Sequence, residues 1–287
     1  MRIRRLGPEG PEVSVIGLGG MLLSIKGRPP ADQSQRVIRS ALDQGITLFD
    51  TADAYCQDEH EMGHNERTLA LGLEGQRERV IVMTTVGCRR PGGAWTVDSD
   101  PEYLTEAVHR CLKNQGVETL DLVSLYAKDL RVPYEESIGA LARLKEAGKI
   151  KYVGACNVDI PLLQKARGVT AIQSVQNRWS PQHREAERDG LIEYCSERGI
   201  AFVGYAPFGG TFGAPTLTTL GKLSDQARRR RLSPYQLVLS WMTNKSSNLF
   251  VVPGARRSES VEDSAGAGSV EFDADAVRAV ENTLPQP

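Results

Sequence analysis

Several features that mark other classes of protein are missing from this sequence of 287 residues. It contains no run of roughly 18 apolar residues, the length that a membrane-spanning helix requires. Its basic start, MRIRRLGPEG, is not followed by the apolar segment of a signal peptide. The formal charge is only −1, which excludes a general field that would attract nucleic acid or anionic lipid. We expect a cytoplasmic protein with a small-molecule substrate and no nucleic-acid or membrane partner; the sequence indicates no oligomeric state.

Cysteine is sparse, and its spacing indicates no disulfide framework. The five cysteines are an odd number without close pairs, which favours a reducing compartment. Cys56, His60 and His64 have the i, i+4 spacing that metal ligands sometimes show on one face of a helix. The segment that joins them has a loop-like composition, and a fourth ligand is not evident. We therefore predict no metal site.

The sequence does contain an alternation of short apolar, β-rich runs with segments of helical length. Strands that alternate with helices indicate a parallel sheet, and eight repeats indicate closure into a barrel. We predict a single (β/α)₈ TIM barrel over residues 1–287, which is a normal length for this fold. The predicted strands are Val15–Gly19, Thr47–Asp50, Val80–Val86, Leu120–Tyr126, Tyr152–Ala155, Ala171–Gln176, Ala201–Tyr205 and Leu249–Val252.

Helix signals and a hairpin complete this pattern. Residues 32–44, 101–115 and 133–147 have helical periodicity, and each segment ends before a glycine. Residues 2–6 and 12–16 are joined by a segment rich in glycine and proline, which is typical of a β-hairpin. We expect this hairpin to precede the barrel and to plug its bottom.

Five segments carry weaker predictions. The Gly/Pro/Thr-rich residues 206–221 form an unusually long connection at the expected active-site end of the barrel, which suggests a lid. Residues 264–269 and 285–287 are predicted to be mobile, with a helix over 273–282 between them. The basic run 228–231 is interpreted as the solvated end of a helix rather than as a patch for an acidic partner.

Active sites of such barrels lie at the carboxyl ends of the strands, and there the sequence resembles the aldo-keto reductases. The resemblance extends over almost the whole chain, and its segments follow the order that they have in that family. These segments are FDTADAY (49–55), GHNE (63–66), DLVSLY (121–126), GKIKYVGACN (148–157), VQNRWS (175–180), YAPFG (205–209) and VVPGARR (251–257).

The resemblance implies a nicotinamide cofactor in an extended pose, with NADPH preferred over NADH. Asn157 and Gln176 match the residues that hydrogen-bond the carboxamide, and Trp179 matches an aromatic ring against the nicotinamide. Arg256 and Arg257 match a segment in which arginine can hold a 2′-phosphate by a bidentate contact. The remaining cofactor residues implied are Gly20, Met21, Asp50, Tyr205, Ala206, Pro207, Phe208, Gly209, Pro253, Gly254 and Asp263, the last followed by serine where the family commonly has asparagine.

The sequence departs from the family in the catalytic tetrad of Asp, Tyr, Lys and His. Asp50 and Tyr55 match, but Thr85 stands where the resemblance places lysine and Tyr126 where it places histidine. Tyr126 is either a second proton donor or a wall of the site. Lys128 is either a cation that reaches back over the site or a solvated loop residue. We include both in the candidate catalytic set.

These replacements decide which functions we consider. A free tyrosine has a pKa near ~10, and a nearby cation would lower it, so reduction of ordinary ketones is expected to be impaired. The leading hypothesis is an NAD(P)H-dependent oxidoreductase that acts on an unusual small carbonyl, enone or iminium compound. One alternative is a lyase, epimerase or cyclase that uses Asp50, Tyr55 and Tyr126 without net redox chemistry. The other is a non-catalytic protein that binds nicotinamide.

Overall fold

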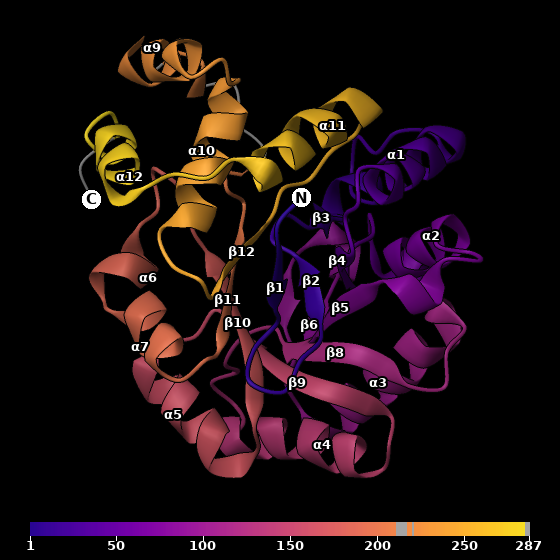
Figure 1. Cartoon of the computed structure of the whole chain (residues 1–287). Coiled ribbons are helices and arrows are strands. Elements are labelled where there is room, and N and C mark those ends of the chain that lie inside the picture. The colour runs from indigo at the N-terminus through magenta and orange to yellow at the C-terminus, as the bar shows by residue number, and fades with distance from the viewer. Residues whose placement is uncertain (211–216, 220, 285–287) are drawn as a thin grey trace.

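Eight parallel strands in sequence order form one sheet, each paired with the strand before it (Figure 1). The structure is a computed structural model that describes residues 1–210, 217–219 and 221–284. Every predicted strand is present, which confirms the alternation seen in the sequence. The strands are β3 (Leu18–Gly19), β4 (Leu48–Ala52), β5 (Ile81–Val86), β8 (Leu120–Leu125), β9 (Ile150–Cys156), β10 (Ile172–Arg178), β11 (Ala201–Tyr205) and β12 (Leu249–Val252).

The sheet closes into a barrel where its last strand meets its first. Isolated parallel bridges join Ile16 to Val251 and Gly19 to Gly254, beside β12 and β3. The amide of Gly17 donates to the Val251 carbonyl at 2.8 Å. A Cβ atom at Gly19 would lie 2.7 Å from the Val252 carbonyl oxygen, so the seam requires glycine there. The predicted (β/α)₈ barrel is therefore confirmed.

Helices cover the outside of the barrel, and the predicted ones begin and end close to the expected residues. The helix over 101–115 shows why: Asp100 accepts hydrogen bonds from the first-turn amides, and Gly116 ends the helix with φ +66°. The described helices are α1 (Ala31–Asp43), α2 (His64–Gly72), α3 (Pro101–Gln115), α4 (Tyr134–Glu146), α5 (Ile160–Val169), α6 (Glu185–Arg188), α7 (Leu191–Glu197), α9 (Gly221–Arg229), α10 (Pro234–Asn244), α11 (Ser258–Gly266) and α12 (Ala274–Glu281).

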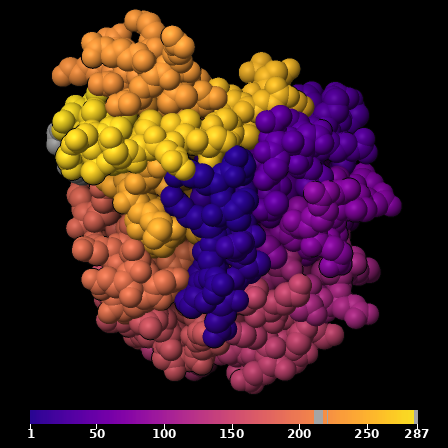
Figure 2. Space-filling model, in the orientation of Figure 1, coloured from indigo at the N-terminus to yellow at the C-terminus, as the bar shows by residue number. Residues whose placement is uncertain are grey.

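The amino-terminal hairpin lies across the bottom of the barrel, as predicted. β1 (Ile3–Arg5) and β2 (Glu12–Ser14) are antiparallel, and Figure 2 shows this segment in indigo over the middle of the visible face. Leu6 is fully buried in the cluster that fills the barrel interior, and its carbonyl accepts a hydrogen bond from Gln173 Nε2 at 2.7 Å. The hairpin therefore closes the end of the barrel opposite to the candidate site.

The Ala/Gly-rich residues 264–269 correct a prediction, because they are ordered and packed instead of mobile. They form the end of α11 and a short 3₁₀ turn, Ala267–Ser269. A Cβ atom at Gly268 would lie 2.3 Å from Met1 Sδ, so small residues are needed for close packing in this segment. Residues 285–287, for which mobility was also predicted, lie outside the described residues.

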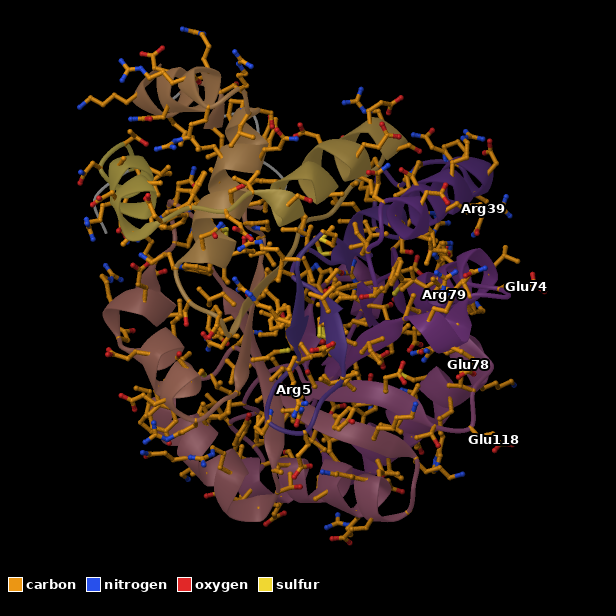
Figure 3. All side chains as sticks on the ribbon, in the orientation of Figure 1. Arg5, Arg39, Glu74, Glu78, Arg79 and Glu118 are labelled. Atoms are coloured by element: carbon orange, nitrogen blue, oxygen red, sulfur yellow. The ribbon has the colours of Figure 1, made fainter. Side chains whose placement is uncertain are left out.

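Many charged side chains lie on the outer surface, among them the six that are labelled in Figure 3. The basic run 228–231 lies at the carboxyl end of α9. Arg228 pairs with Asp225, and the Arg230 guanidinium lies over the Phe272 ring. This agrees with the predicted solvated helix end. None of the helices that the structure describes combines the length and the apolar composition needed to cross a membrane.

Candidate functional site

A cavity of about 560 Å³ opens at the carboxyl ends of the barrel strands. This is the end at which the barrel fold predicts a site, and most of the predicted site residues line it. In the described part of the chain, the lining contains no lysine or histidine. The lining residues are Gly19, Met21, Leu22, Asp50, Tyr55, Thr85, Trp95, Tyr126, Cys156, Asn157, Gln176, Tyr205, Ala206, Pro207, Phe208, Gly210, Val252, Gly254 and Arg256.

A buried carboxyl group and a phenol form the floor of the cavity. Asp50 lies in β4 and is only 3% exposed. Tyr55 donates its hydroxyl to Asp50 Oδ2 at 3.4 Å, and Gln176 Nε2 donates to Oδ1 at 2.8 Å. Burial raises the pKa of Asp50 to about 7, against the effect of these two hydrogen bonds. Burial, reinforced by Asp50, also raises the pKa of Tyr55 well above its usual value, so the phenol keeps its proton.

Thr85 and Tyr126 lie at the same end of the barrel, Thr85 near the end of β5 and Tyr126 directly after β8. Thr85 is 7% exposed, and its hydroxyl lies 3.7 Å from the Sγ atom of Cys156 rather than on Asp50. The ring of Tyr126 lines the cavity, and burial raises the pKa of its phenol. The structure therefore brings Asp50, Tyr55, Thr85 and Tyr126 around one cavity and supplies no ammonium group to Asp50.

Lys128 does not join this group. Its side chain is exposed, and it is absent from the cavity lining. Tyr126, two residues before it, lines the cavity, and Asp129, the next residue, pairs with Arg131. Among the described residues, no contact directs the Lys128 side chain towards the cavity. Its position agrees with a solvated loop lysine and gives no support to a catalytic cation.

Two side-chain amides, those of Asn157 and Gln176, line the middle of the cavity. Asn157 has φ +54°, a conformation that asparagine tolerates better than most residues, and its Nδ2 donates to the Tyr126 carbonyl at 2.8 Å. The hydroxyl of Tyr205 donates to Asn157 Oδ1 at 2.8 Å. Ala206, the next residue, is also held at positive φ (+51°), and such strain concentrates at functional sites. This part of the wall is consequently fixed by backbone conformation as well as by hydrogen bonds.

Trp179 corrects a prediction, because it does not face the cavity. Its side chain is 0% exposed and packs against Phe202 and Trp241, with ring centroids 5.9 and 5.5 Å away. Side chains alternate along a strand, so residue 179 follows the opposite face from Gln176 and enters the helix layer. Tyr205 is one of the aromatic residues that line the cavity, together with Tyr55, Trp95, Tyr126 and Phe208. Counting the alternation from Gln176 would have revealed the orientation of Trp179 in the sequence.

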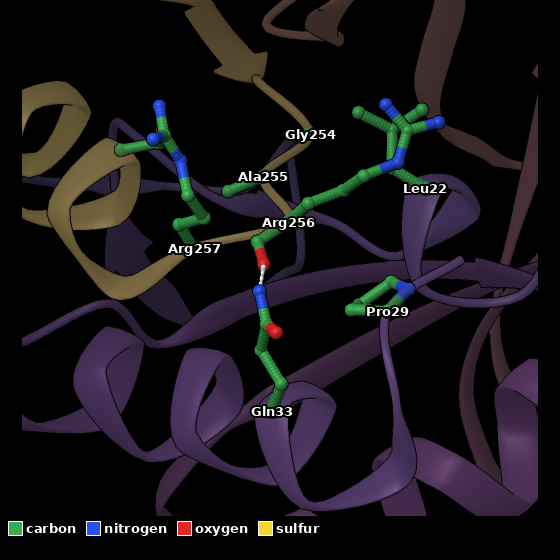
Figure 4. Close-up of a pocket in the computed structure, with 8 residues that line it drawn as sticks. Leu22, Pro29, Gln33, Gly254, Ala255, Arg256 and Arg257 are labelled. Atoms are coloured by element: carbon green, nitrogen blue, oxygen red, sulfur yellow. Dashed lines mark hydrogen bonds between the residues drawn. The ribbon is translucent and has the colours of Figure 1, made fainter. Parts of the chain in front are cut away.

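A second hollow of about 490 Å³ adjoins the cavity (Figure 4). The two share Leu22, Gly254 and Arg256, so they form one continuous groove. Figure 4 shows the side chains of Arg256 and Arg257 spreading in different directions from the chain after Gly254, while Gln33 Nε2 donates to the Arg256 carbonyl at 2.6 Å. Arg256 Nε is buried without a hydrogen-bond partner among the described residues. At this end of the groove, one hydrogen-bond donor is therefore without a partner.

The remaining predicted cofactor residues support the groove without lining it. The Gly20 amide donates to the Asp50 carbonyl, and the Pro253 carbonyl accepts from the Gly19 amide. The Gly209 carbonyl accepts from Arg178 Nη2 at 3.1 Å. Asp263 accepts a hydrogen bond from Ser233 at 2.8 Å. The predicted lid is described only in part, because residues 211–216 and 220 lie outside the described residues.

Sequence reasoning missed several residues that border the groove. Leu22 and Trp95 line the main cavity, and Gln33 and Ser260 line the second hollow. Trp95 comes from a small hairpin of β6 (Cys88–Arg89) and β7 (Thr96–Val97), inserted between β5 and α3. The long connection after β5 was a signal for this hairpin, because such loops build the mouth of a barrel.

The cysteine and histidine candidates do not converge on a metal. His64 contacts Ser24 Oγ through Nδ1 at 2.9 Å, and the His60 side chain is largely exposed. No group of three potential ligands occurs among the described residues. All five cysteines are free and buried.

Comparison with known proteins gives one consistent family. A model of the aldo/keto reductase family matches residues 15–284. A probable aldo-keto reductase from Glycine max is 29% identical, over 98% of this chain and 88% of that protein.

Among solved structures, an aldo-keto reductase from Klebsiella pneumoniae in complex with NADP and acetate has 22% identity and a TM-score of 0.82, covering 100% of this chain and 97% of that one. The glycerol dehydrogenase from Gluconobacter oxydans has 22% identity and a TM-score of 0.84, covering 98% and 94%. At these identities the structures establish the fold alone, whereas the family match spans nearly the whole sequence. The chain therefore belongs to the aldo/keto reductase family, a family of oxidoreductases.

Proposed function

We propose that this protein is an NADP-dependent oxidoreductase whose substrate is an unusual small carbonyl, enone or iminium compound. The observation that carries the proposal is the continuous groove from Asp50 and Tyr55 at one end to Arg256 and Arg257 at the other. An extended dinucleotide would place its nicotinamide at the first end and its adenosine at the second. The NADP in the similar Klebsiella pneumoniae structure supports this choice of cofactor.

The residues along the groove fit such a cofactor. Asn157 and Gln176 offer amide donors and acceptors for the carboxamide, and the ring of Tyr205 is available for stacking. Ala206, Pro207 and Phe208 line the intermediate stretch. The unpartnered Nε of Arg256 suits a 2′-phosphate, because arginine binds phosphate oxygens through several N–H groups. We therefore expect NADPH to bind more tightly than NADH.

The chemistry at the reacting end follows from the state of Tyr55. When bound, the nicotinamide supplies a hydride. Tyr55, whose hydroxyl donates to Asp50, is the expected donor of the proton. Its raised pKa makes it a weak acid, and no ammonium lines the cavity in the described residues to lower it. Simple aldehydes and ketones, which need a proton on the developing alkoxide, should therefore react slowly. Conjugated enones and iminium ions depend less on this proton, so they are the better acceptors.

Two measurements test this proposal. Fluorescence titration with NADPH and with NADH should show tighter binding of NADPH; equal affinities would contradict the role of the arginines. Turnover followed by cofactor absorbance should be faster with a conjugated enone than with the matched saturated ketone. Turnover of a simple aldehyde at the ~10 s⁻¹ that is common for enzymes would contradict our interpretation of Thr85 and Tyr126.

A second candidate function has its own supporting observation. Asp50 has a pKa of about 7 and shares a hydrogen bond with Tyr55, so this pair is suited to moving a proton at neutral pH. A lyase, epimerase or cyclase could use the pair without consuming cofactor. Parallel measurement of substrate conversion and NADPH oxidation separates the two: equal amounts support the reductase, and conversion without oxidation supports the second candidate.

A further inference from the structure

One buried arginine beside the cavity lacks the partners that its charge requires. Arg90 follows β6 and is only 5% exposed, yet its Nε and Nη1 atoms are buried without hydrogen-bond partners among the described residues. Its Nη2 donates to the Gln57 carbonyl at 3.0 Å. A buried guanidinium is normally paired with a carboxylate, because an unpaired buried charge is unfavourable. Arg90 therefore has hydrogen-bonding capacity that the described chain does not use.

The carboxylates in this region form no ion pair with Arg90 among the described residues. The buried Asp53 lies 3.9 Å from Arg110, and its two oxygens have no hydrogen-bond partner in the part of the chain that the structure describes. Asp98 pairs with Arg89, and Asp129 pairs with Arg131. Glu59 accepts a hydrogen bond from the amide of Gly92. No ion pair within 4.0 Å involves Arg90 in the described residues. The missing counter-ion would thus have to come from a molecule that enters the site.

Trp95 connects Arg90 to the cavity. The Arg90 guanidinium lies 3.7 Å from the centroid of the Trp95 ring, and Trp95 lines the cavity with its ring edge-to-face against Tyr55 at 6.2 Å. A stacked ring covers the face of a guanidinium, whereas the N–H groups point outward in its plane. The charge of Arg90 also opposes the larger effect of burial on the pKa of Tyr126, which places this cation near the reacting end.

Trp95 lies at the surface, beside the tip of its hairpin. Trp95 is 44% exposed and follows Gly92 and Gly93, which have φ +54° and +84°. A Cβ at Gly92 would meet no atom within 4 Å, whereas a Cβ at Gly93 would lie 3.0 Å from the Gln57 carbonyl oxygen. Because the Trp95 side chain lies outside the buried core, displacement of the indole from Arg90 by a ligand would leave the core packing unchanged.

We propose that Arg90 binds a carboxylate on the substrate, so that the preferred acceptors are small anionic carbonyl, enone or iminium acids, with Trp95 as a movable cover over the arginine. This inference rests on the proposed function, because it assigns the cavity as the reaction site. It adds a substrate class and a specificity-determining residue. The carboxylate would replace the contact between the arginine and the indole by charge-assisted hydrogen bonds.

The test uses benzoate and its neutral analogue benzamide as probes, titrated into the protein with and without NADPH. We expect benzoate to bind roughly 10- to 100-fold more tightly than benzamide, the range for hydrogen bonds to charged groups. Arg90→Gln should abolish this preference, and Arg90→Lys should keep part of it. Equal binding of the two probes to the wild-type protein would overturn the proposal even where a variant fails to fold, and so would a preference that persists in Arg90→Gln.

Arg89→Gln provides a matched control. Arg89 is the neighbouring arginine and also lies over an aromatic ring, that of Tyr103 at 3.9 Å, but it is paired with Asp98. This variant should retain the preference for benzoate; its loss would overturn the assignment to Arg90. The NADPH titration on the same samples tests the proposed function separately. A protein that distinguishes benzoate from benzamide but binds no NADPH would refute the proposed function and leave the anion site intact.

The indole supplies an independent signal. Trp179 and Trp241 are fully buried, so Trp95 is the tryptophan whose emission should respond to a ligand. Benzoate should increase quenching of this emission by iodide, and benzamide should not. Trp95→Phe should remove the response. A benzoate-induced change that remains in Trp95→Phe would overturn the role of Trp95 as the cover.

Discussion

The two ends of the groove differ in how their polar groups are satisfied. At the reacting end, Asp50 is held by Gln176 and Tyr55, and Asn157 is held between Tyr205 and the Tyr126 carbonyl. At the other end, Arg256 keeps a buried Nε without a partner among the described residues. The polar groups that line the first end are paired with one another, and its unpartnered donors belong to Arg90 behind Trp95, whereas at the second end the unpartnered donor belongs to a lining residue, Arg256.

This difference indicates that binding of the cofactor and the chemical step depend on opposite ends of the groove. The arginine end retains what an anionic cofactor needs, since spare donors at a cavity are used when a phosphate arrives. The reacting end keeps the carboxyl group and the phenol but has no cation to pair with them in the described lining. Binding of a cofactor and activity on ordinary carbonyls should therefore respond to different substitutions.

The largest expected effect comes from supplying the missing groups at the reacting end. Thr85→Lys with Tyr126→His should raise the reduction of simple aldehydes by ~10²–10⁴-fold, because an ammonium would lower the pKa of Tyr55 and pair with Asp50. Thr85 lines the cavity, so a longer side chain can extend into it. Steady-state kinetics measure the effect. Thr85→Met with Tyr126→His is the control of similar length without charge, and equal gains in both double variants would refute the electrostatic reason.

A change in the pH dependence of stability should follow from Asp50→Asn. Burial raises the pKa of Asp50 to about 7 from its usual 3.8, so the folded protein holds a proton that the unfolded chain releases between these values. The wild-type protein therefore loses stability as pH rises from about 4 to 7, and Asp50→Asn removes this loss. The free energy of unfolding of the variant, relative to wild type, should rise by about 2–3 kcal/mol between pH 5 and pH 8. Urea unfolding at both values measures it; a constant difference would show that the Asp50 carboxyl is ionised throughout.

At the opposite end, Arg256→Ala should weaken NADPH binding by roughly 10- to 100-fold, the range for hydrogen bonds to a charged group. NADH binding should change far less, because NADH lacks the 2′-phosphate. Arg39→Ala is the matched control, since Arg39 is an exposed arginine of α1 that points into solvent (Figure 3). Fluorescence titration distinguishes the variants. Equal losses for both cofactors would mean that Arg256 acts on the shared part of the dinucleotide.

The smallest expected effect lies between the two ends. Tyr205→Phe keeps the ring that lines the cavity and removes the hydroxyl that donates to Asn157 Oδ1. NADPH affinity should fall only about 2- to 10-fold, the effect of one neutral hydrogen bond. Tyr205→Leu, which also removes the ring, should cost more in the same titration. Equal effects of the two substitutions would show that the ring does not stack on the cofactor.

Much of the site could be predicted because it lies where strands end. Asp50 and Thr85 lie near the carboxyl ends of β4 and β5, Tyr126 directly follows β8, and the carboxyl ends of parallel strands meet at one face of the barrel. The segment after β12 likewise placed Arg256 at the groove. The strands could be predicted from the sequence because short apolar runs alternate with capped helices, such as the helix between Asp100 and Gly116.

The sequence by itself thus determined the order of strands and helices, the barrel and the end at which chemistry takes place. Only the tertiary structure decided which way particular side chains point. Trp179 packs against Phe202 and Trp241, which come from elements distant in the sequence, and the Lys128 side chain is exposed and lies outside the cavity lining. The stacking of Trp95 on Arg90 joins neighbours in a hairpin whose geometry depends on packing against Tyr55. Local patterns fix the path of the backbone, whereas the surroundings of each side chain come from elements distant in the sequence.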